Sequence, residues 1–114
     1  MAYHCAGTQA KTLQRLKQGK LSVSRTLDLH GYTLDEAQPL ILHLLEDAYF
    51  AQDRVLRIVH GKGHSSASDF PPLKNLVNTL LHQHPCVLAF CSATARDGGT
   101  GACYILLKRN KDTS

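Results

Sequence analysis

The sequence predicts a single α/β domain whose elements follow one another in the order β-α-β-α-β-β. Its 114 residues fit one domain. Short runs rich in Val, Ile and Leu alternate with two segments whose apolar residues recur at helical spacing. Because a strand, a crossover helix and a strand form a right-handed parallel unit, we expect a four-stranded mixed sheet with two main helices. The last strand should turn back antiparallel, since its connection holds only about ten residues and no helix.

The first 24 residues are expected to form a basic N-terminal extension. Five basic residues precede the first acidic one: Lys11, Arg15, Lys17, Lys20 and Arg25. A short helix is expected within this segment from Thr8, with Gly19 as its stop. The domain proper should span 25–110 and be followed by a tail at 111–114.

The first strand is expected at 25–29, and a helix should follow it. Residues 33–36, Thr-Leu-Asp-Glu, match a capping box. Apolar residues at helical spacing carry this helix to Phe50: Ala37, Leu40, Ile41, Leu44, Leu45 and Ala48. Pro39 conflicts with a helix interior, where it costs about 3 kcal/mol. A start nearer Asp35 would place Pro39 in the tolerant first turn.

The rest of the chain repeats the strand-and-helix pattern. A second strand is expected at 54–59, followed by a Gly- and Ser-rich loop at 60–68. A second helix should begin near Asp69, with an apolar stripe formed by Leu73, Leu76, Val77, Leu80 and Leu81. Third and fourth strands are expected at 86–91 and 102–108.

Composition limits the class of protein. The four cysteines, Cys5, Cys86, Cys91 and Cys103, form no CxxC pair, and three lie in apolar runs. This pattern favours reduced, buried thiols over a zinc site or disulfides. The sequence shows neither a membrane span nor a signal pattern, so we expect a cytoplasmic protein that does not bind membranes. The net charge of +4 weakly favours an anionic partner.

Chemically useful residues should gather at one edge of the sheet, because loops leaving parallel strands share the edge at their C-terminal ends. The first strand leaves through His30, the second through His60, and a glycine turn at 98–101 enters the last strand. Asp28 and His30 lie two residues apart on a strand and so point to one face. Asp28 could orient the imidazole, or it could simply cap a neighbouring turn, with His30 satisfied by backbone.

The glycine-rich turns could cradle phosphate. Gly61 and Gly63 let backbone amides approach an anion, and Lys62 between them adds a charge. The same alternatives, phosphate cradle or tight turn, apply to the last loop, where Gly99 and Gly101 lie close to Arg96.

Together these motifs resemble the Smr (small MutS-related) domain, over roughly residues 25–109. The resemblance rests on LDLHG at 27–31, IVHGKG at 58–63, PPLK at 71–74 and GGTGACYILLKR at 98–109. It implies a fold similar to the C-terminal domain of a translation initiation factor. It also implies nicking or endonuclease activity on DNA or RNA, in some members on messenger RNA at stalled ribosomes.

The sequence therefore predicts an endonuclease that acts on nucleic acid, with the ribosome as a further partner implied by the resemblance. The expected catalytic residues are Asp28, His30 and His60, and the expected phosphate contacts are Gly61, Lys62, Gly63, Arg96, Gly99 and Gly101. RNA is favoured over DNA, because acid–base attack by a ribose 2′-hydroxyl needs no cofactor, whereas water attack on DNA usually calls for a divalent metal. The alternatives are a non-catalytic module that binds nucleic acid or the ribosome, and an enzyme of small phosphorylated molecules.

Overall fold

The computed structural model describes residues 2–61 and 72–110 as an α/β domain with a five-stranded mixed sheet and three α-helices. The elements are, in order, β1 (Ala2–His4), α1 (Ala10–Lys17), β2 (Arg25–Asp28), α2 (Leu34–Ala51), β3 (Val55–Val59), α3 (Pro72–Gln83), β4 (Val87–Ser92) and β5 (Ala102–Leu107). Two short 3₁₀ helices, η1 (Ala95–Asp97) and η2 (Gly99–Gly101), connect β4 to β5.

The strands lie in the order β1-β4-β5-β3-β2. β2 and β3 are parallel, and β5 lies antiparallel between β3 and β4. The expected antiparallel return of the last strand is therefore confirmed. It inserts beside β3, so that β4 keeps the direction of β2 and β3 but contacts neither of them.

The sheet has five strands rather than the expected four, and the additional strand, β1, comes from the segment 1–24. The two main helices are α2 and α3, and the short helix expected from Thr8 is confirmed as α1, with Gly19 at a φ of +69° after its end. β1 pairs antiparallel with β4 and places Tyr3 opposite Phe90. Leu16 of α1 is only 2% exposed and packs in a cluster with residues of β4 and β5. The pattern could not show β1, because three residues are too few for a visible alternation. Residues 2–17 are thus part of the packed fold.

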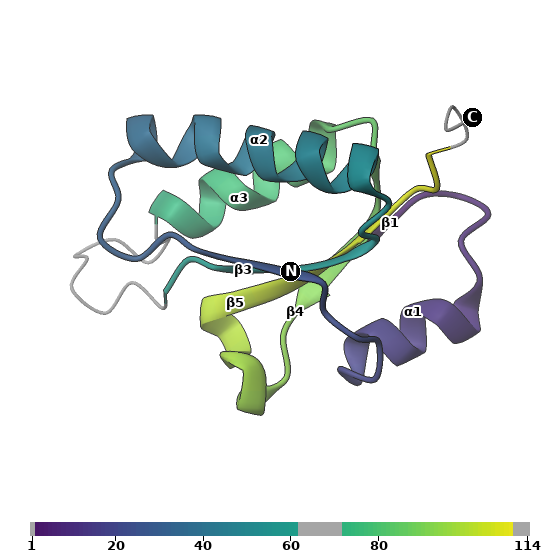
Figure 1. Cartoon of the computed structure of the whole chain (residues 1–114). Helices are drawn as coiled ribbons and strands as arrows, with labels where there is room; N and C mark the ends of the chain where they lie inside the picture. Colours follow the sequence, from purple (N-terminus) through teal and green to yellow (C-terminus); the bar gives the residue numbers. More distant parts are fainter. Residues whose placement is uncertain (1, 62–71, 111–114) are drawn as a thin grey trace.

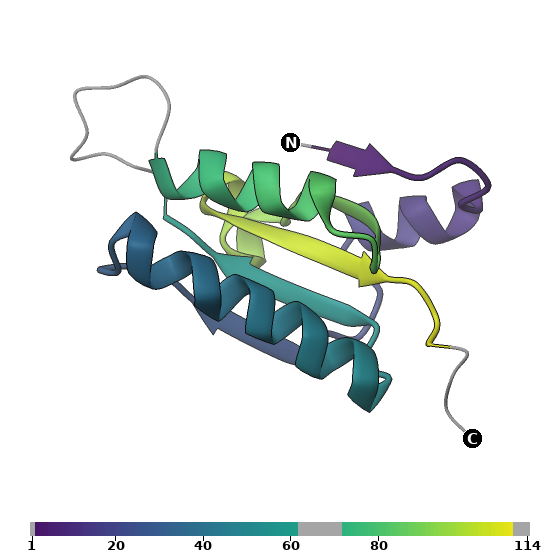
Figure 2. The same cartoon turned by 90° about the horizontal axis from the view of Figure 1, so that it is seen from above.

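Helices cover both faces of the sheet. α2 and α3 lie side by side on one face, while α1 and the 3₁₀ helices lie on the other (Figures 1 and 2). The core between the sheet and α2–α3 includes Leu29, Ile41, Leu45, Ile58, Leu81, Cys103 and Ile105. The smaller cluster on the α1 side includes Leu16, Cys91, Ala102, Tyr104 and Leu106. All six residues of β5 are buried because both faces of this strand are covered.

The N-terminus of α2 confirms the capping box. Thr33 Oγ1 accepts from the Glu36 N–H (3.2 Å), and Glu36 Oε1 accepts from the Thr33 N–H (2.9 Å). Since α2 begins at Leu34, Pro39 is an interior residue of the helix rather than a first-turn residue. The exposed Pro39 therefore leaves one carbonyl of the first turn without its helical partner.

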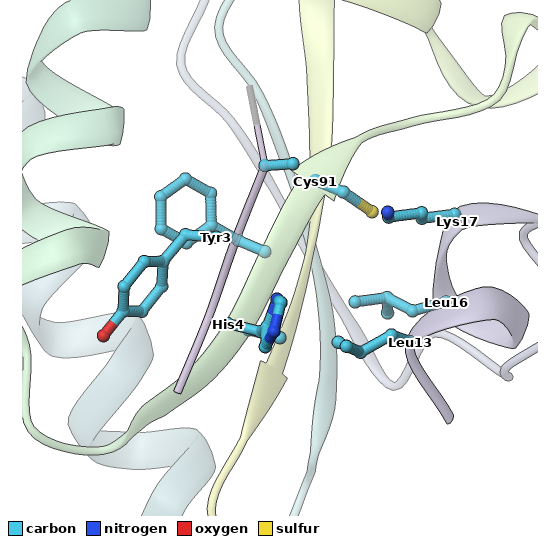
Figure 3. A pocket seen from close by; sticks show the side chains of 9 residues that line it. Tyr3, His4, Leu13, Leu16, Lys17 and Cys91 are labelled. Carbon is cyan, nitrogen blue, oxygen red and sulfur yellow. The ribbon is translucent and has the colours of Figure 1, made fainter. Parts of the chain in front are cut away.

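A cavity of about 230 Å³ lies between α1 and the β1–β4 edge (Figure 3). Lys17 extends across it toward Cys91, and Leu13 and Leu16 form its α1 side. Burial raises the pKa of the Cys91 thiol above its usual range.

No helix within 2–61 and 72–110 has the length and apolar character to cross a membrane.

We predict that Leu16→Ala lowers the free energy of unfolding by about 2–5 kcal/mol, because it leaves a cavity against β4 and β5. Urea unfolding followed by circular dichroism measures this change. The control is Gln14→Ala on the exposed side of the same helix, which should stay within about 0.5 kcal/mol of the parent. Equal stability of the two variants would mean that α1 is a detached extension.

Candidate functional site

The ends of three neighbouring strands meet at one edge of the sheet. Asp28, the last residue of β2, is in register with Val59, the last residue of β3. Val59 is in register with Ala102, the first residue of β5. The turns that follow β2 and β3 therefore lie beside the η2 turn that precedes β5.

Asp28 and His30 form a direct pair at this edge. Asp28 Oδ1 lies 3.0 Å from His30 Nδ1 and also accepts the backbone N–H of His30 at 3.0 Å. The His30 side chain is 81% exposed and that of Asp28 53% exposed, so both reach solvent. Because an ionised carboxylate only accepts, Nδ1 carries the proton in this contact, and Nε2 of a neutral ring keeps its lone pair.

The Asp28 carboxyl is held in its charged form. The backbone N–H of His30 is the main cause that lowers the pKa of Asp28, followed by the His30 ring; the charge of Arg57 contributes less. The side chain thus stays a carboxylate at neutral pH and remains able to orient the imidazole. The spacing of the two residues left open whether Asp28 orients the imidazole or caps the turn, and in the structure its carboxylate makes both contacts.

The exposure of His60 differs from the expectation that both histidines would face an open site at this edge. It follows β3 at the same edge, but it is only 4% exposed. Its Nδ1 donates to the Gly61 carbonyl (2.9 Å), and Nε2 is buried without a hydrogen-bond partner in the described part of the chain. Burial lowers the pKa of His60, and the nearby charge of Lys74 lowers it further. In this structure the His60 ring is therefore not open to solvent, whereas the His30 ring is.

The backbone of Gly101 joins the turn after β3 to the turn before β5. Its carbonyl accepts both the His60 N–H and the Gly61 N–H, each at 2.9 Å. Gly61 has a φ of +85°, which favours glycine, and a Cβ placed there would meet nothing within 4 Å. Of the two glycines expected to contact phosphate here, Gly61 has open space beside its backbone, whereas Gly101 is buried.

The loop between β4 and β5 is a rigid turn rather than an open glycine loop. Gly98 and Gly99 both have positive φ, and a Cβ at Gly98 would lie 2.8 Å from the Ala102 side chain. Beneath the loop, Asp97 accepts from Tyr104 Oη and lies 3.6 Å from Arg57 Nη1. Arg96 is exposed on its surface. Of the expected phosphate contacts, Lys62 and Gly63 lie outside the described residues.

A shallow cavity of about 410 Å³ surrounds the pair and contains residues that the sequence analysis did not single out. It is lined by Asp28, His30, Gly31, Tyr32 and Glu36. Tyr32 is 45% exposed, so its ring is open to solvent beside His30. Its position directly after His30-Gly31 was the available signal. Glu36 is engaged with Thr33 in the capping box.

The described residues contain no group of three or more His, Cys, Asp or Glu side chains arranged to hold a metal ion. The cavity at this edge combines one exposed imidazole, the Asp28 carboxylate bound to it, the Tyr32 ring and Glu36. An imidazole oriented by a carboxylate can accept and release a proton.

Comparisons with known proteins agree with the motifs. Residues 27–108 match the family model described as Smr domain. A probable DNA endonuclease named SmrA from Escherichia coli is 29% identical over 103 residues, which cover 90% of this chain and 55% of that protein. A ribosome rescue factor named SmrB from Shewanella putrefaciens is 33% identical over 101 residues, covering 89% of this chain and 54% of that protein. This chain thus spans about half the length of these relatives.

Solved structures are also similar. The stand-alone small MutS-related protein YdaL from Escherichia coli superposes with a TM-score of 0.83 at 28% identity, covering 95% of this chain and 82% of YdaL. The Smr domain of Thermus thermophilus MutS2 superposes with a TM-score of 0.65 at 28% identity, covering 74% of this chain and 98% of that domain. The YdaL match covers more of the chain than the family model does, because it extends beyond residues 27–108.

We predict that the His60 ring titrates below the ordinary value of 6.5. NMR of the ring Cε1–H between pH 8 and pH 5 measures its pKa, and the same signal in urea should return to about 6.5. Because the folded-state pKa is the lower one, the unfolded chain takes up a proton first as the pH falls below 6.5. The free energy of unfolding should therefore decrease over that range. A folded-state pKa at or above the denatured one would contradict the buried position of His60.

Proposed function

Because the chain belongs to the Smr domain family, we propose that it is an endonuclease that cleaves RNA at the Asp28–His30 pair. The observation that supports this most is the Asp28 carboxylate on His30 Nδ1 together with the 81% exposure of the His30 side chain. This combination leaves Nε2 oriented, unprotonated when the ring is neutral, and open to a substrate.

The proposed reaction is an internal transesterification. His30 Nε2 removes the proton of a ribose 2′-hydroxyl, and the oxygen attacks the adjacent phosphorus. The bond from phosphorus to the 5′ oxygen breaks, which leaves a 2′,3′-cyclic phosphate and a 5′-hydroxyl. A water molecule protonates the leaving oxygen, and His30 returns its proton to solvent. Asp28 holds the ring and offsets the charge that the ring gains.

His60 has a structural role in this proposal. With Nδ1 on Gly61 and its backbone N–H on Gly101, it fixes the turn after β3. The expected acid–base pair is thereby reduced to one exposed histidine. The Gly61 N–H donates to the Gly101 carbonyl (2.9 Å) and the Gly99 N–H to the Thr94 carbonyl (2.8 Å), so neither amide is free for an anion. We therefore assign the negative charge that develops on the phosphate to Arg96, with Lys62 and Gly63 as further contacts implied by the motif.

RNA is the proposed substrate because a carboxylate–histidine pair supplies a base, and a ribose supplies its own nucleophile. Cleavage of DNA would require attack by water, which usually involves a divalent metal. The relatives point both ways, since one is named a DNA endonuclease and others are named ribosome rescue factors. The latter name supports the ribosome as the setting, and messenger RNA as the strand is what the resemblance of the motifs implies.

Tyr32 suits an unpaired base next to the scissile phosphate. Its ring lines the same cavity as His30 and is 45% exposed. Stacking of a base on an aromatic ring contributes about 1–3 kcal/mol and requires that the base be out of a duplex. The proposed substrate is therefore single-stranded at the cleavage point.

We predict that His30→Ala lowers the cleavage rate of single-stranded RNA by about 10²–10⁴-fold, the range that a positioned base contributes. Asp28→Asn should reduce the rate by less, because the amide keeps its place but loses the charge. The measurement is cleavage of end-labelled RNA with EDTA present. His43→Ala, an exposed histidine on α2, is the matched control and should keep full activity.

A second substrate separates this chemistry from water attack. RNA with a 2′-deoxy sugar at the scissile position should resist cleavage while binding as tightly as the parent strand. Cleavage of that strand, or full activity of folded His30→Ala, would overturn the proposal. Binding of RNA and DNA without cleavage under every condition would favour a non-catalytic binding module.

For Tyr32 we expect that the alanine variant raises KM for single-stranded RNA by about 5–100-fold, whereas Tyr32→Phe keeps the parent value, since the ring rather than the hydroxyl stacks. The matched control is Phe50→Ala, which removes a 72% exposed ring at the far end of α2. Steady-state kinetics on strands with and without a base beside the scissile phosphate make the comparison. An unchanged KM in Tyr32→Ala would rule out stacking.

A further inference from the structure

A second cationic cavity lies at the end of the sheet opposite the Asp28–His30 pair. Arg54 directly precedes β3, and Arg109 follows β5 by two residues. Together with Thr8, Gln9 and Thr12 from the start of α1, they line a cavity of about 260 Å³. The cavity exists only because α1 packs on the sheet, so the family motifs at 27–108 do not include its α1 wall.

The two arginines face this cavity without a carboxylate. No acidic residue lines it, and neither Arg54 nor Arg109 forms an ion pair within residues 2–61 and 72–110. The adjacent Asp53 is instead bound to Arg25 at 2.7 Å. The arrangement therefore places two like charges beside one hollow with nothing in the described structure to neutralise them.

Arg54 is held in place for such a role. Its Nε donates to the Leu107 carbonyl at 3.0 Å, which fixes the plane of the guanidinium and leaves the terminal nitrogens for another acceptor. Burial is the main cause that lowers the pKa of Arg54, and the charge of Arg109 adds to it. An anion between the two groups would relieve this repulsion.

Donors from α1 complete the cavity. Gln9, at the N-cap, makes no side-chain capping bond, and the first turn of α1 contains no acidic residue. The backbone N–H groups at the start of α1 and the Thr12 hydroxyl therefore lie beside the arginines, and no acidic side chain of the first turn neutralises them. Guanidinium forks, hydroxyls and helix N–H groups are the donors that proteins use for phosphate.

We propose that the cavity between Arg54, Arg109 and the start of α1 binds a backbone phosphate of the nucleic-acid strand that the Asp28–His30 pair cleaves. The proposal rests on the proposed function for the identity of the strand. Arg54 and His60 are six residue steps apart along the extended chain of β3, which at about 3.3 Å a step is roughly 20 Å. Because Asp28 is in register with Val59, the Asp28–His30 pair lies at the His60 end of that span. A strand would need about six stacked nucleotides to reach both.

The test measures binding, so that it does not depend on cleavage. Single strands of about twelve and about three nucleotides, made with 2′-O-methyl sugars that cannot attack phosphorus, are titrated at several salt concentrations by fluorescence anisotropy. Arg109→Gln should weaken binding of the long strand and lower the slope of log K against log salt by about 0.7, the value for one contact on a single strand. The combination Arg54→Gln with Arg109→Gln should lower the slope further.

The matched control is Arg15→Gln with Lys20→Gln, which removes the same charge from exposed positions outside the cavity. It should leave the slope at the parent value, and the short strand should bind all proteins alike. Arg109→Gln, at an exposed residue, keeps the test valid if the Arg54 variant fails to fold. Equal slopes for Arg109→Gln and the control would overturn the proposal.

A further arm separates a strand from a free anion. Millimolar inorganic phosphate, followed by amide NMR shifts of Thr8, Gln9 and Thr12, should weaken binding of the long strand as it fills the cavity. Shifts without any competition would mean a site for free phosphate and would overturn the assignment to a strand. The salt titration and the phosphate competition both measure binding, so neither depends on whether His30→Ala still cleaves RNA.

Discussion

The position of β5 is the constraint on which the rest of the structure depends. It lies antiparallel between β3 and β4 and is buried along its whole length. A shift of its register by one residue would exchange its two faces and move Tyr104 away from Asp97 and Thr94. The same shift would remove Gly101 from the two N–H groups that it accepts after β3. The edge that carries the candidate site is therefore set by the packing of a strand that contributes no catalytic side chain.

The Asp28–His30 pair, by contrast, contributes little to the fold. Both side chains are more than half exposed, and exposed ion pairs are worth about 0–1 kcal/mol. Nevertheless, Asp28 Oδ1 accepts from two donors of His30, the backbone N–H and the ring Nδ1. Such an arrangement restricts the imidazole to one orientation at the surface. Asp28 therefore makes two contributions at this edge, since it caps the backbone of the turn after β2 and orients the exposed imidazole.

Much of this edge could be predicted from the sequence because its signals are local. The capping box at Thr33 and Glu36, the alternation that places Asp28 and His30 on one face, and the short return into β5 each depend on residues close in the chain. The burial of His60 could not be predicted in this way. It depends on β5 as a neighbour, and the order of strands is a property of the whole sheet.

The contribution of residues 2–17 was only partly accessible to local signals. The short helix that ends before Gly19 was expected from the sequence and is confirmed as α1, whereas β1 has only three residues and produces no alternation of useful length. Their basic composition suggested an extension for binding. In the structure α1 packs against β4 and β5, which brings the polar, uncharged residues at its start beside Arg54 and Arg109.

The two ends of β3 also differ in what they can contribute to a reaction. A phosphate held by arginines roughly 20 Å from the scissile bond keeps the same contacts in the ground state and in the transition state. Interactions of this kind lower KM without raising kcat, unless they also restrict how the strand lies. β3 and β5 are hydrogen-bonded along their length, so the spacing between the two ends is fixed. A strand held at the arginine cavity would therefore meet His30 at a set distance, and the cavity would act by selecting which phosphate reaches the imidazole.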